Sequence, residues 1–161
     1  MQKSVYAPWR EGYLLAPKEK KEKGCLFCRV MKEKRDKYNL ILHRGENTFV
    51  IMNRYPYTSG HLMIVPYKHI GSLEKLKEDI AYELMLETRR AVGILKKALK
   101  PDGINIGMNL GRPSGAGVPG HLHVHVVPRW SGDTNFMPVV GDTRVVSISL
   151  STTYKILRPL F

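Results

Sequence analysis

Three histidines stand at alternate positions of one short segment, H-L-H-V-H-V-V, as His121, His123 and His125. The residues between and after them are apolar and mostly β-branched, which is typical of a β-strand. Because successive side chains of a strand point to opposite faces at about 3.3 Å per residue, the three imidazoles are expected on one face, about 6–7 Å apart. Histidine serves as a base, a nucleophile or a metal ligand. The segment therefore predicts a strand with one face in a core and the other face in a chemical site.

The rest of the chain predicts a single compact α+β domain. It has 161 residues, of which 43% are apolar, enough to bury a core of its own. Residues 48–52 and 61–65 are predicted strands joined by a turn that contains proline and glycine. Residues 77–99 have helical periodicity and end at a Pro-Asp-Gly stop, while residues 104–110 and 145–150 are predicted as further strands. The expected architecture is an antiparallel sheet of about five strands with one long helix.

Charge and hydropathy limit the expected partners and location. The net charge is +12, which favours partners that carry phosphate. However, the lysine-rich runs at residues 18–23 and 32–37 mix both signs, as solvated surfaces do, and no nucleic-acid-binding motif accompanies them. No apolar run approaches the length of about 18 residues that a membrane helix needs, and no signal-peptide pattern is present. A cytoplasmic protein without a membrane or nucleic-acid partner is expected, with residues 1–24 as an N-terminal extension and residues 25–161 as the domain.

The histidine segment admits three interpretations: solvated side chains, a tri-histidine metal centre, or nucleophilic catalysis. Two same-face neighbours on a strand can converge on a metal, but the third histidine usually diverges too far. A glycine-rich loop from Gly111 to Gly120 comes directly before the histidines, and its backbone N–H groups suit phosphate oxygens. This neighbourhood favours phosphorus chemistry, in which a neutral imidazole attacks phosphorus and forms a phosphoramidate.

The segment resembles the signature of the histidine triad family, His-φ-His-φ-His-φ-φ, in which φ is apolar. The similarity continues through N-R-Y-P-Y-T-S-G-H-L-M-I-V-P and I-N-I-G-M-N-L-G and covers the chain from about Cys25 onward. A-P-W-R near the start and G-D-T-N-F-M-P after the histidines are similar to the branch that contains diadenosine tetraphosphate phosphorylases and related nucleotidyl hydrolases. The resemblance implies a histidine triad fold and a homodimer, whose interface could use Tyr6, Trp9 and the C-terminal segment.

The resemblance also implies roles for individual residues. His123 corresponds to the nucleophile that attacks the α-phosphorus of a nucleotide, His125 to a phosphate contact, and His121 to a residue that orients the site. The nucleotide-binding positions implied in the same way are Ile51 and Met63 for the purine, Asn53 for the ribose, His61 as a supporting hydrogen-bond partner, and Asn109, Gly115, Ala116, Gly117 and Val118 for the phosphates. From composition alone, Ile51 and Met63 fit a core, and Asn53 could simply cap its turn.

A second site is predicted at Cys25 and Cys28, the two cysteines of the chain. A C-x-x-C pair alone is shared by redox pairs and metal sites, and a cytoplasmic location disfavours a disulfide. Histidine triad proteins that pair C-x-x-C with two histidines resemble this chain, which implies a structural Cys₂His₂ zinc site completed by His69 and His121. His43, in a predicted loop, is the alternative third ligand. His121 would then connect the metal to the strand that carries the nucleophile.

The function implied by the resemblance is an enzyme that cleaves dinucleoside polyphosphates or related nucleoside monophosphate conjugates, with an adenine-containing nucleotide as the expected substrate. Two alternatives remain. Inorganic phosphate could replace water as the acceptor, although the loop G-A-G-V lacks the hydroxyl found in the loop of some phosphorylases, which favours hydrolysis. The chain could also be a nucleotide-binding protein with weak catalysis, for which only the basic charge argues.

Overall fold

The computed structural model describes residues 24–134, 136, 140–141 and 146–161. The chain divides into two compact units, and residues 24–130 together with 146–161 form the larger one, to which the elements below belong. The predicted N-terminal extension lies outside the described residues except for Gly24, as do Tyr6 and Trp9 of the expected dimer interface.

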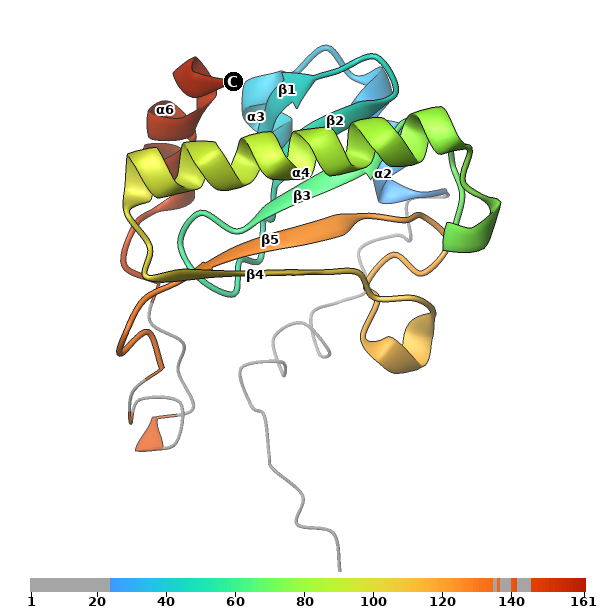
Figure 1. Ribbon diagram of the computed structural model, residues 1–161. Coiled ribbons are helices and arrows are strands. Elements are labelled where there is room, and N and C mark those ends of the chain that lie inside the picture. Colours follow the sequence, from blue (N-terminus) through green and yellow to red (C-terminus); the bar gives the residue numbers. More distant parts are fainter. Residues whose placement is uncertain (1–23, 135, 137–139, 142–145) are drawn as a thin grey trace, which may run out of the picture. The chain divides into compact units, whose positions relative to one another are not determined.

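One antiparallel sheet of five strands, in the order β1-β2-β3-β5-β4, organises this unit (Figure 1). Its strands are β1 (Ile41–Arg44), β2 (Thr48–Met52), β3 (Leu62–Pro66), β4 (Gly103–Gly107) and β5 (Val124–Arg129). The long helix α4 (Glu78–Leu99) lies between β3 and β4 in the chain, and it packs across the sheet. The predicted α+β class, the antiparallel sheet and the single long helix are confirmed.

One predicted strand is wrong, and one strand was not predicted. Of the predicted strand at residues 145–150, residue 145 lies outside the described residues and residues 146–149 form no strand. Helix α6 (Leu150–Leu157) begins at the next residue, because the Ser149 hydroxyl accepts a hydrogen bond from the Thr152 N–H and caps the helix. The fifth strand is β1 instead, where Ile41 and Leu42 are fully buried. It follows a charged run and lacks the alternation by which strands are recognised.

The histidine segment is a strand only in its second half. Strand β5 begins at Val124, so His121 and His123 lie in the last residues of the preceding loop and only His125 lies on the strand. Leu122, Val124 and Val126 are all buried, as the alternation predicted. Strand β4 is likewise shorter than predicted and ends at Gly107.

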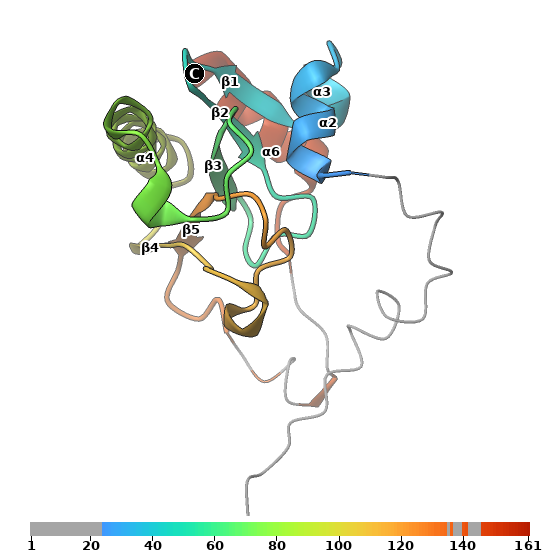
Figure 2. The same cartoon turned by 90° about the vertical axis from the view of Figure 1, so that its right-hand side faces the viewer.

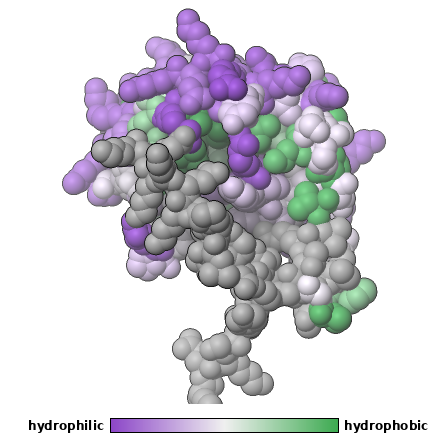
Figure 3. Space-filling view, turned by 180° about the vertical axis from the view of Figure 1, so that it is seen from behind, coloured by the Kyte–Doolittle hydropathy of each residue, from purple (hydrophilic) through white to green (hydrophobic). Residues whose placement is uncertain are grey.

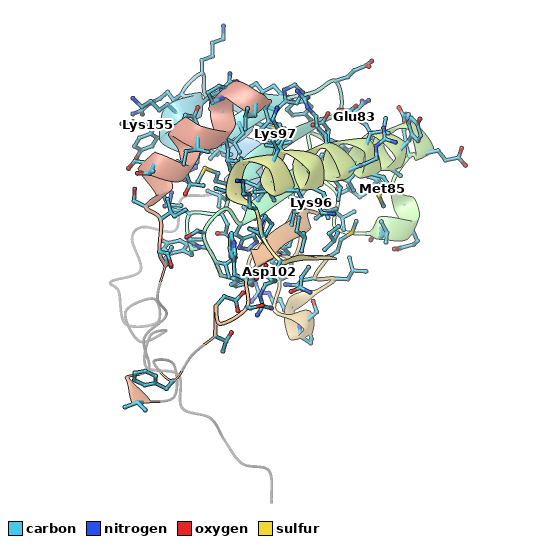
Figure 4. The ribbon with its side chains drawn as sticks, turned by 60° about the vertical axis from the view of Figure 1, so that its left-hand side comes forward. Glu83, Met85, Lys96, Lys97, Asp102 and Lys155 are labelled. Atoms are coloured by element: carbon cyan, nitrogen blue, oxygen red, sulfur yellow. The ribbon has the colours of Figure 1, made fainter. Side chains whose placement is uncertain are left out.

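Helix α4 covers one face of the sheet, as its end-on view shows (Figure 2). Its buried residues recur every three or four positions, which places them on one side of the helix. They are Ile80, Leu84, Thr88, Ala91 and Leu95. Leu84, Ala91 and Leu95 belong to one core cluster, together with residues of the sheet and of α6 that include Val50, Ile64, Val126, Tyr154 and Leu157. The exposed Lys96 and Lys97 lie in the last turn of α4, where positive charge suits the helix dipole (Figure 4).

Two short helices, α2 (Leu26–Lys32) and α3 (Asp36–Asn39), lie on the other side of the sheet (Figure 2). A second apolar cluster forms there from Phe27 and Val30 of α2 and from sheet residues that include Phe49, Ile51 and Met63. Arg44 attaches α3 to the sheet through a bidentate ion pair with Asp36, at 2.8 Å for the shorter contact.

Hydrophilic side chains gather over the end of the molecule that holds β1 and α3 when it is seen from behind (Figure 3). Lys34, Arg35 and Lys37 in this region are exposed, as the mixed-sign run predicted. None of the described helices combines the length and the apolar character needed to cross a membrane.

Candidate active site and metal centre

The predicted site residues share the face of the sheet that α2 covers. His125 of β5 pairs with Met63 of β3, and Met63 pairs with Ile51 of β2. Residues directly opposite each other on neighbouring strands point to the same face. Ile51 and Met63 belong to the apolar cluster around Phe27. The three side chains of Ile51, Met63 and His125 therefore lie side by side, from this cluster to the half-buried His125.

The proton position of His123 follows from its hydrogen bond. Its Nδ1 lies 2.9 Å from the backbone oxygen of His121. A carbonyl oxygen only accepts hydrogen bonds, so Nδ1 carries the proton, and the Nε2 of the neutral ring holds a free electron pair. His123 is buried, and burial lowers its pKa, which keeps the ring neutral. Nε2 of His123 is therefore suited to act as a nucleophile.

A second chain of hydrogen bonds fixes the proton on His125. The backbone N–H of Tyr57 donates to Nδ1 of His61 at 3.2 Å, so the proton of His61 lies on Nε2. This Nε2 is 2.9 Å from Nδ1 of His125 and donates to it. The neutral His125 must then carry its own proton on Nε2. Burial, followed by the proximity of His123, lowers the pKa of His125 to about 4, so a neutral N–H donor stands beside His123, with ring centroids 4.7 Å apart.

Asn53 both caps a turn and contacts this chain of hydrogen bonds. Its Oδ1 accepts from the N–H of Tyr55 at 2.9 Å, which is the capping role that the sequence left open. Its Nδ2 lies 3.3 Å from Nδ1 of His61. Asn53 thus lies directly beside the histidines, and its predicted contact with ribose stays a prediction.

The glycine-rich loop connects to the site at both ends. Gly115 has a φ of +90°, and a Cβ at that position would lie 3.9 Å from Nδ2 of Asn109, so these two predicted phosphate contacts are neighbours. At the other end, the N–H of His121 donates to the carbonyl of Val118 at 3.1 Å. These contacts place the loop near the histidines, and the phosphate-binding roles of Asn109 and of residues 115–118 stay predictions.

The predicted metal ligands come together. The ligand atoms of Cys25, Cys28, His69 and His121 all lie within 4.8 Å of one another. Nδ1 of His121 is 3.2 Å from Sγ of Cys25, 3.6 Å from Sγ of Cys28 and 3.3 Å from Nδ1 of His69. A tetrahedral zinc ion with bonds of about 2.0 Å to nitrogen and 2.3 Å to sulfur holds its ligand atoms about 3.3–3.8 Å apart. The three distances from His121, and the 3.3 Å between Sγ of Cys28 and Nδ1 of His69, are close to this spacing.

The orientation of His121 also fits a metal ligand. Its Nε2 donates to the carbonyl of Pro66 at 2.8 Å, which leaves the electron pair of Nδ1 directed at the cluster. A carbonyl that accepts from the outer nitrogen of a ligating histidine is the usual support of such a ligand. The segment of His69 is held against the loop segment of His121, because the N–H of Leu122 donates to the carbonyl of Ile70 at 2.7 Å.

Comparison with known proteins identifies the family. The model of the HIT domain matches residues 34–132. The chain belongs to the HIT domain family. The match confirms the resemblance to histidine triad proteins that the sequence suggested.

Individual relatives agree with this assignment. The chain is 42% identical over 122 residues to AP-4-A phosphorylase of Mycobacterium tuberculosis, and the alignment covers 76% of this chain but only 63% of that protein. The HIT domain is similar in structure to a zinc-bound histidine triad family protein from Mycobacterium smegmatis, with a TM-score of 0.69, 25% identity, and coverage of 85% and 92% of the two chains. A hypothetical histidine triad nucleotide-binding protein from Sulfolobus tokodaii gives a TM-score of 0.68 at 29% identity, with coverage of 84% and 91%.

His43, the alternative metal ligand, does not belong to the cluster of this HIT domain. It lies on strand β1 rather than in the predicted loop, and its Nε2 accepts a hydrogen bond from Arg90 at 3.0 Å. Its ring stacks on Phe161, with 6.3 Å between the centroids. The alternative ligand assignment is therefore wrong.

Four groups that hold the histidines of the HIT domain were not predicted. They are the side chain of Phe27, the carbonyls of Pro66 and His121, and the N–H of Tyr57. The three backbone groups have no sequence signal, since every residue except proline has an N–H and every residue has a carbonyl. The position of Phe27 between the two cysteines was the one available indication.

Proposed function

We propose that this HIT domain protein cleaves the α-phosphate linkage of dinucleoside polyphosphates, or of related nucleoside monophosphate conjugates, through a nucleotidyl intermediate on His123. The observation that carries the proposal is the hydrogen bond from Nδ1 of His123 to the carbonyl of His121. This bond leaves Nε2 unprotonated, with its electron pair available beside the N–H of His125. The 42% identity to AP-4-A phosphorylase supports the substrate class, with an adenine nucleotide as the first candidate.

The reaction has two displacements at phosphorus. In the first, Nε2 of His123 bonds to the α-phosphorus, and the bond from phosphorus to the bridging oxygen breaks with departure of the remaining phosphate chain. In the second, the acceptor oxygen bonds to phosphorus and the P–N bond breaks, which regenerates His123. The Nε2–H of His125 donates to the phosphoryl oxygens throughout, and His61 keeps that proton in place.

The remaining predicted residues bind the nucleotide in this proposal. Ile51 and Met63 contact the purine, Asn53 the ribose, and Asn109 the phosphate. The backbone N–H groups of residues 115–118 stabilise the charge on the transferring group. The adjacency of Asn109 and Gly115 supports this arrangement.

The acceptor defines a second candidate, a dinucleoside polyphosphate phosphorylase. The name of the Mycobacterium tuberculosis relative favours inorganic phosphate, whereas the loop without a hydroxyl favours water. Diadenosine tetraphosphate yields AMP and ATP with water but ADP and ATP with phosphate. Chromatography of the products in phosphate and in phosphate-free buffer distinguishes the two enzymes.

Trapping of the intermediate tests the mechanism itself. Rapid acid-free quenching and mass spectrometry of the peptide that contains residues 121–129 are expected to find one added AMP on His123 in the wild type and none in His123→Asn. A His123→Asn variant that keeps near-full activity on dinucleoside polyphosphates, phosphoramidates and adenylates would overturn the proposal.

Zinc is the proposed occupant of the Cys₂His₂ cluster. The donor set, its spacing and the zinc-bound relative from Mycobacterium smegmatis support this metal. A site built on two thiolates also suits a reducing, cytoplasmic location. Elemental analysis of the purified protein is expected to find about one zinc per chain; less than half an equivalent, with none regained on refolding with zinc, would contradict the site.

A homodimer is the proposed assembly. Strand β4 is at the edge of the sheet, and Ile106 on it is 53% exposed, which leaves an apolar edge available for pairing. Sedimentation equilibrium is expected to give twice the chain mass, and a monomer at micromolar concentration would contradict this assembly.

A further inference from the structure

Phe27 contacts both the metal cluster and the proposed nucleophile. It lies in the first turn of α2, between Cys25 and Cys28, and is 2% exposed. Its ring meets the ring of His121 edge-on, with 5.4 Å between the centroids, and lies 5.1 Å from the ring of His123. One aromatic side chain thus packs against a metal ligand and against the group that performs the chemistry.

The position of Phe27 depends on the cluster, because α2 has little else to hold its beginning. The helix has seven residues and no side-chain cap at its N-terminus, and a helix this short is not stable alone. Three attachments hold it to the sheet. They are the ligand atoms of Cys25 and Cys28 beside His121, the burial of Phe27 and Val30, and, near the end of the helix, a hydrogen bond from Arg44 of β1 to the carbonyl of Met31. The first attachment lies in the same turn as Phe27.

The ring of His123 has three contacts. The carbonyl of His121 fixes its Nδ1, the ring of Phe27 packs against it, and the ring of His125 lies edge-on to it. His121 is itself held by the carbonyl of Pro66 and by the cluster. Two of the three contacts, those of His121 and Phe27, therefore come from residues that the cluster orders.

We propose that Phe27 is a positioning residue, which couples the metal cluster to the orientation of His123 and so sets the rate of the chemical step. This inference rests on the proposed function of His123 as the nucleophile. When the cluster is not assembled, the first turn of α2 moves and the His123 ring gains rotational freedom. Misplacement of a reacting atom by about 1 Å costs on the order of a hundredfold in rate, whereas nucleotide affinity does not depend on this ring orientation.

Two matched substitutions test the role of Phe27. Phe27→Leu removes the ring that contacts His121 and His123. Phe49→Leu removes another fully buried ring of the same apolar cluster, one that packs on Phe27 and Tyr67 but on neither histidine. We expect Phe27→Leu to lower kcat by about ten- to a hundredfold with KM changed less than twofold, and Phe49→Leu to leave both parameters within twofold. Equal losses of kcat in the two variants would overturn the proposal.

A spectroscopic measurement keeps the test independent of activity. In ¹⁵N NMR of histidine-labelled protein, wild-type His123 is expected to show a protonated Nδ1 and an unprotonated Nε2. Removal of metal by a chelator and the Phe27→Leu substitution are each expected to give the averaged ¹⁵N shifts of a tautomer mixture. Removal of metal from the Phe27→Leu variant is expected to change these shifts little further. If metal removal leaves the wild-type His123 signals unchanged, the coupling does not exist. The proposed function fails separately, if His123→Asn remains active or no adduct forms.

Discussion

The two faces of the sheet bury different kinds of polar side chain. On the α4 face these are hydroxyls: those of Thr88 and Thr153 donate to the carbonyls four residues earlier in the chain, and that of Tyr154 donates to the carbonyl of Ile41. On the other face, His121 reaches Pro66, 55 residues away in sequence, and His61 reaches His125, 64 residues away. Hydroxyls bonded within their own helix need no tertiary partner, whereas imidazoles bonded across the fold are oriented by it. The α4 face therefore builds stability, and the histidine face orients reactive groups.

Replacement of His123, the proposed nucleophile, is expected to have the largest effect, and to separate activity from stability. His123→Asn should lower kcat about ten-thousandfold or more, as loss of a covalent nucleophile does in other enzymes. The free energy of unfolding should change by only about 1 kcal/mol, because most of the buried apolar contacts remain. Steady-state kinetics and urea unfolding measure the two effects. Residual activity above a tenth of wild type would contradict the assignment of catalysis to the histidine face.

The reverse effect is expected on the α4 face. Leu95 is fully buried in the core under α4, so Leu95→Ala should lower the free energy of unfolding by about 2–5 kcal/mol. Below its unfolding transition the variant should keep the kcat of the wild type. Lys96→Ala, one residue along and exposed, is the control and should change stability by no more than about 0.5 kcal/mol. A loss of kcat in Leu95→Ala at a temperature where it is folded would show that the two faces are not independent.

The α4 face was also the more predictable from sequence. The helix over residues 78–99 follows from its periodicity and from the stop after Lys100, both local properties of the chain. The segment at residues 145–150 shows the limit of that approach. Its alternating apolar residues predict a strand, but residues 146–149 form none, and Ser149 caps helix α6, which begins at Leu150.

On the histidine face, residue types were predictable and their connections were not. The triad and the C-x-x-C pair identify the reactive groups, and the likeness to a family supplied their grouping with His69. The proton positions depend on Pro66 and Tyr57, whose backbone groups become partners only after residues distant in the chain have folded together. No periodicity in the sequence encodes such a contact, so the tautomers of His61, His121 and His125 required the structure.

Two histidine replacements, one on each face, sharpen the comparison. His61→Phe removes the donor to Nδ1 of His125 and should lower kcat by about ten- to a hundredfold, as the loss of a supporting hydrogen bond does at metal and active sites. His43→Phe is the matched control on β1, where the ring contacts Arg90 and Phe161, and should leave kcat unchanged. Kinetics on one dinucleoside polyphosphate measure both. Equal effects of the two changes would remove the proposed role of His61.

The smallest expected effect concerns Glu83, which projects from α4 (Figure 4) and joins it to the turn before β2. Its carboxylate accepts hydrogen bonds from the backbone N–H groups and the side chains of Asn47 and Thr48, at 2.8–3.1 Å. Burial raises the pKa of this carboxyl, but the hydrogen bonds from Thr48 and Asn47 outweigh burial, and the pKa is lowered. Glu83→Gln should therefore cost about 1–3 kcal/mol at pH 7.

The pH dependence of this cost identifies its origin. A carboxyl whose pKa is lower in the folded than in the unfolded state stabilises the fold above the unfolded value, about 4.3 for glutamate, and this contribution is lost as the pH falls through the folded value. The difference in unfolding free energy between wild type and Glu83→Gln should thus stay constant from pH 7 to about pH 5 and shrink below about pH 4. Urea unfolding across this range measures it. The value of kcat should be unaffected by Glu83→Gln, because the contact lies away from the histidines. A difference in unfolding free energy that persists unchanged at pH 3 would mean that the shape of the Glu83 side chain, and not its charge, holds α4 to the turn.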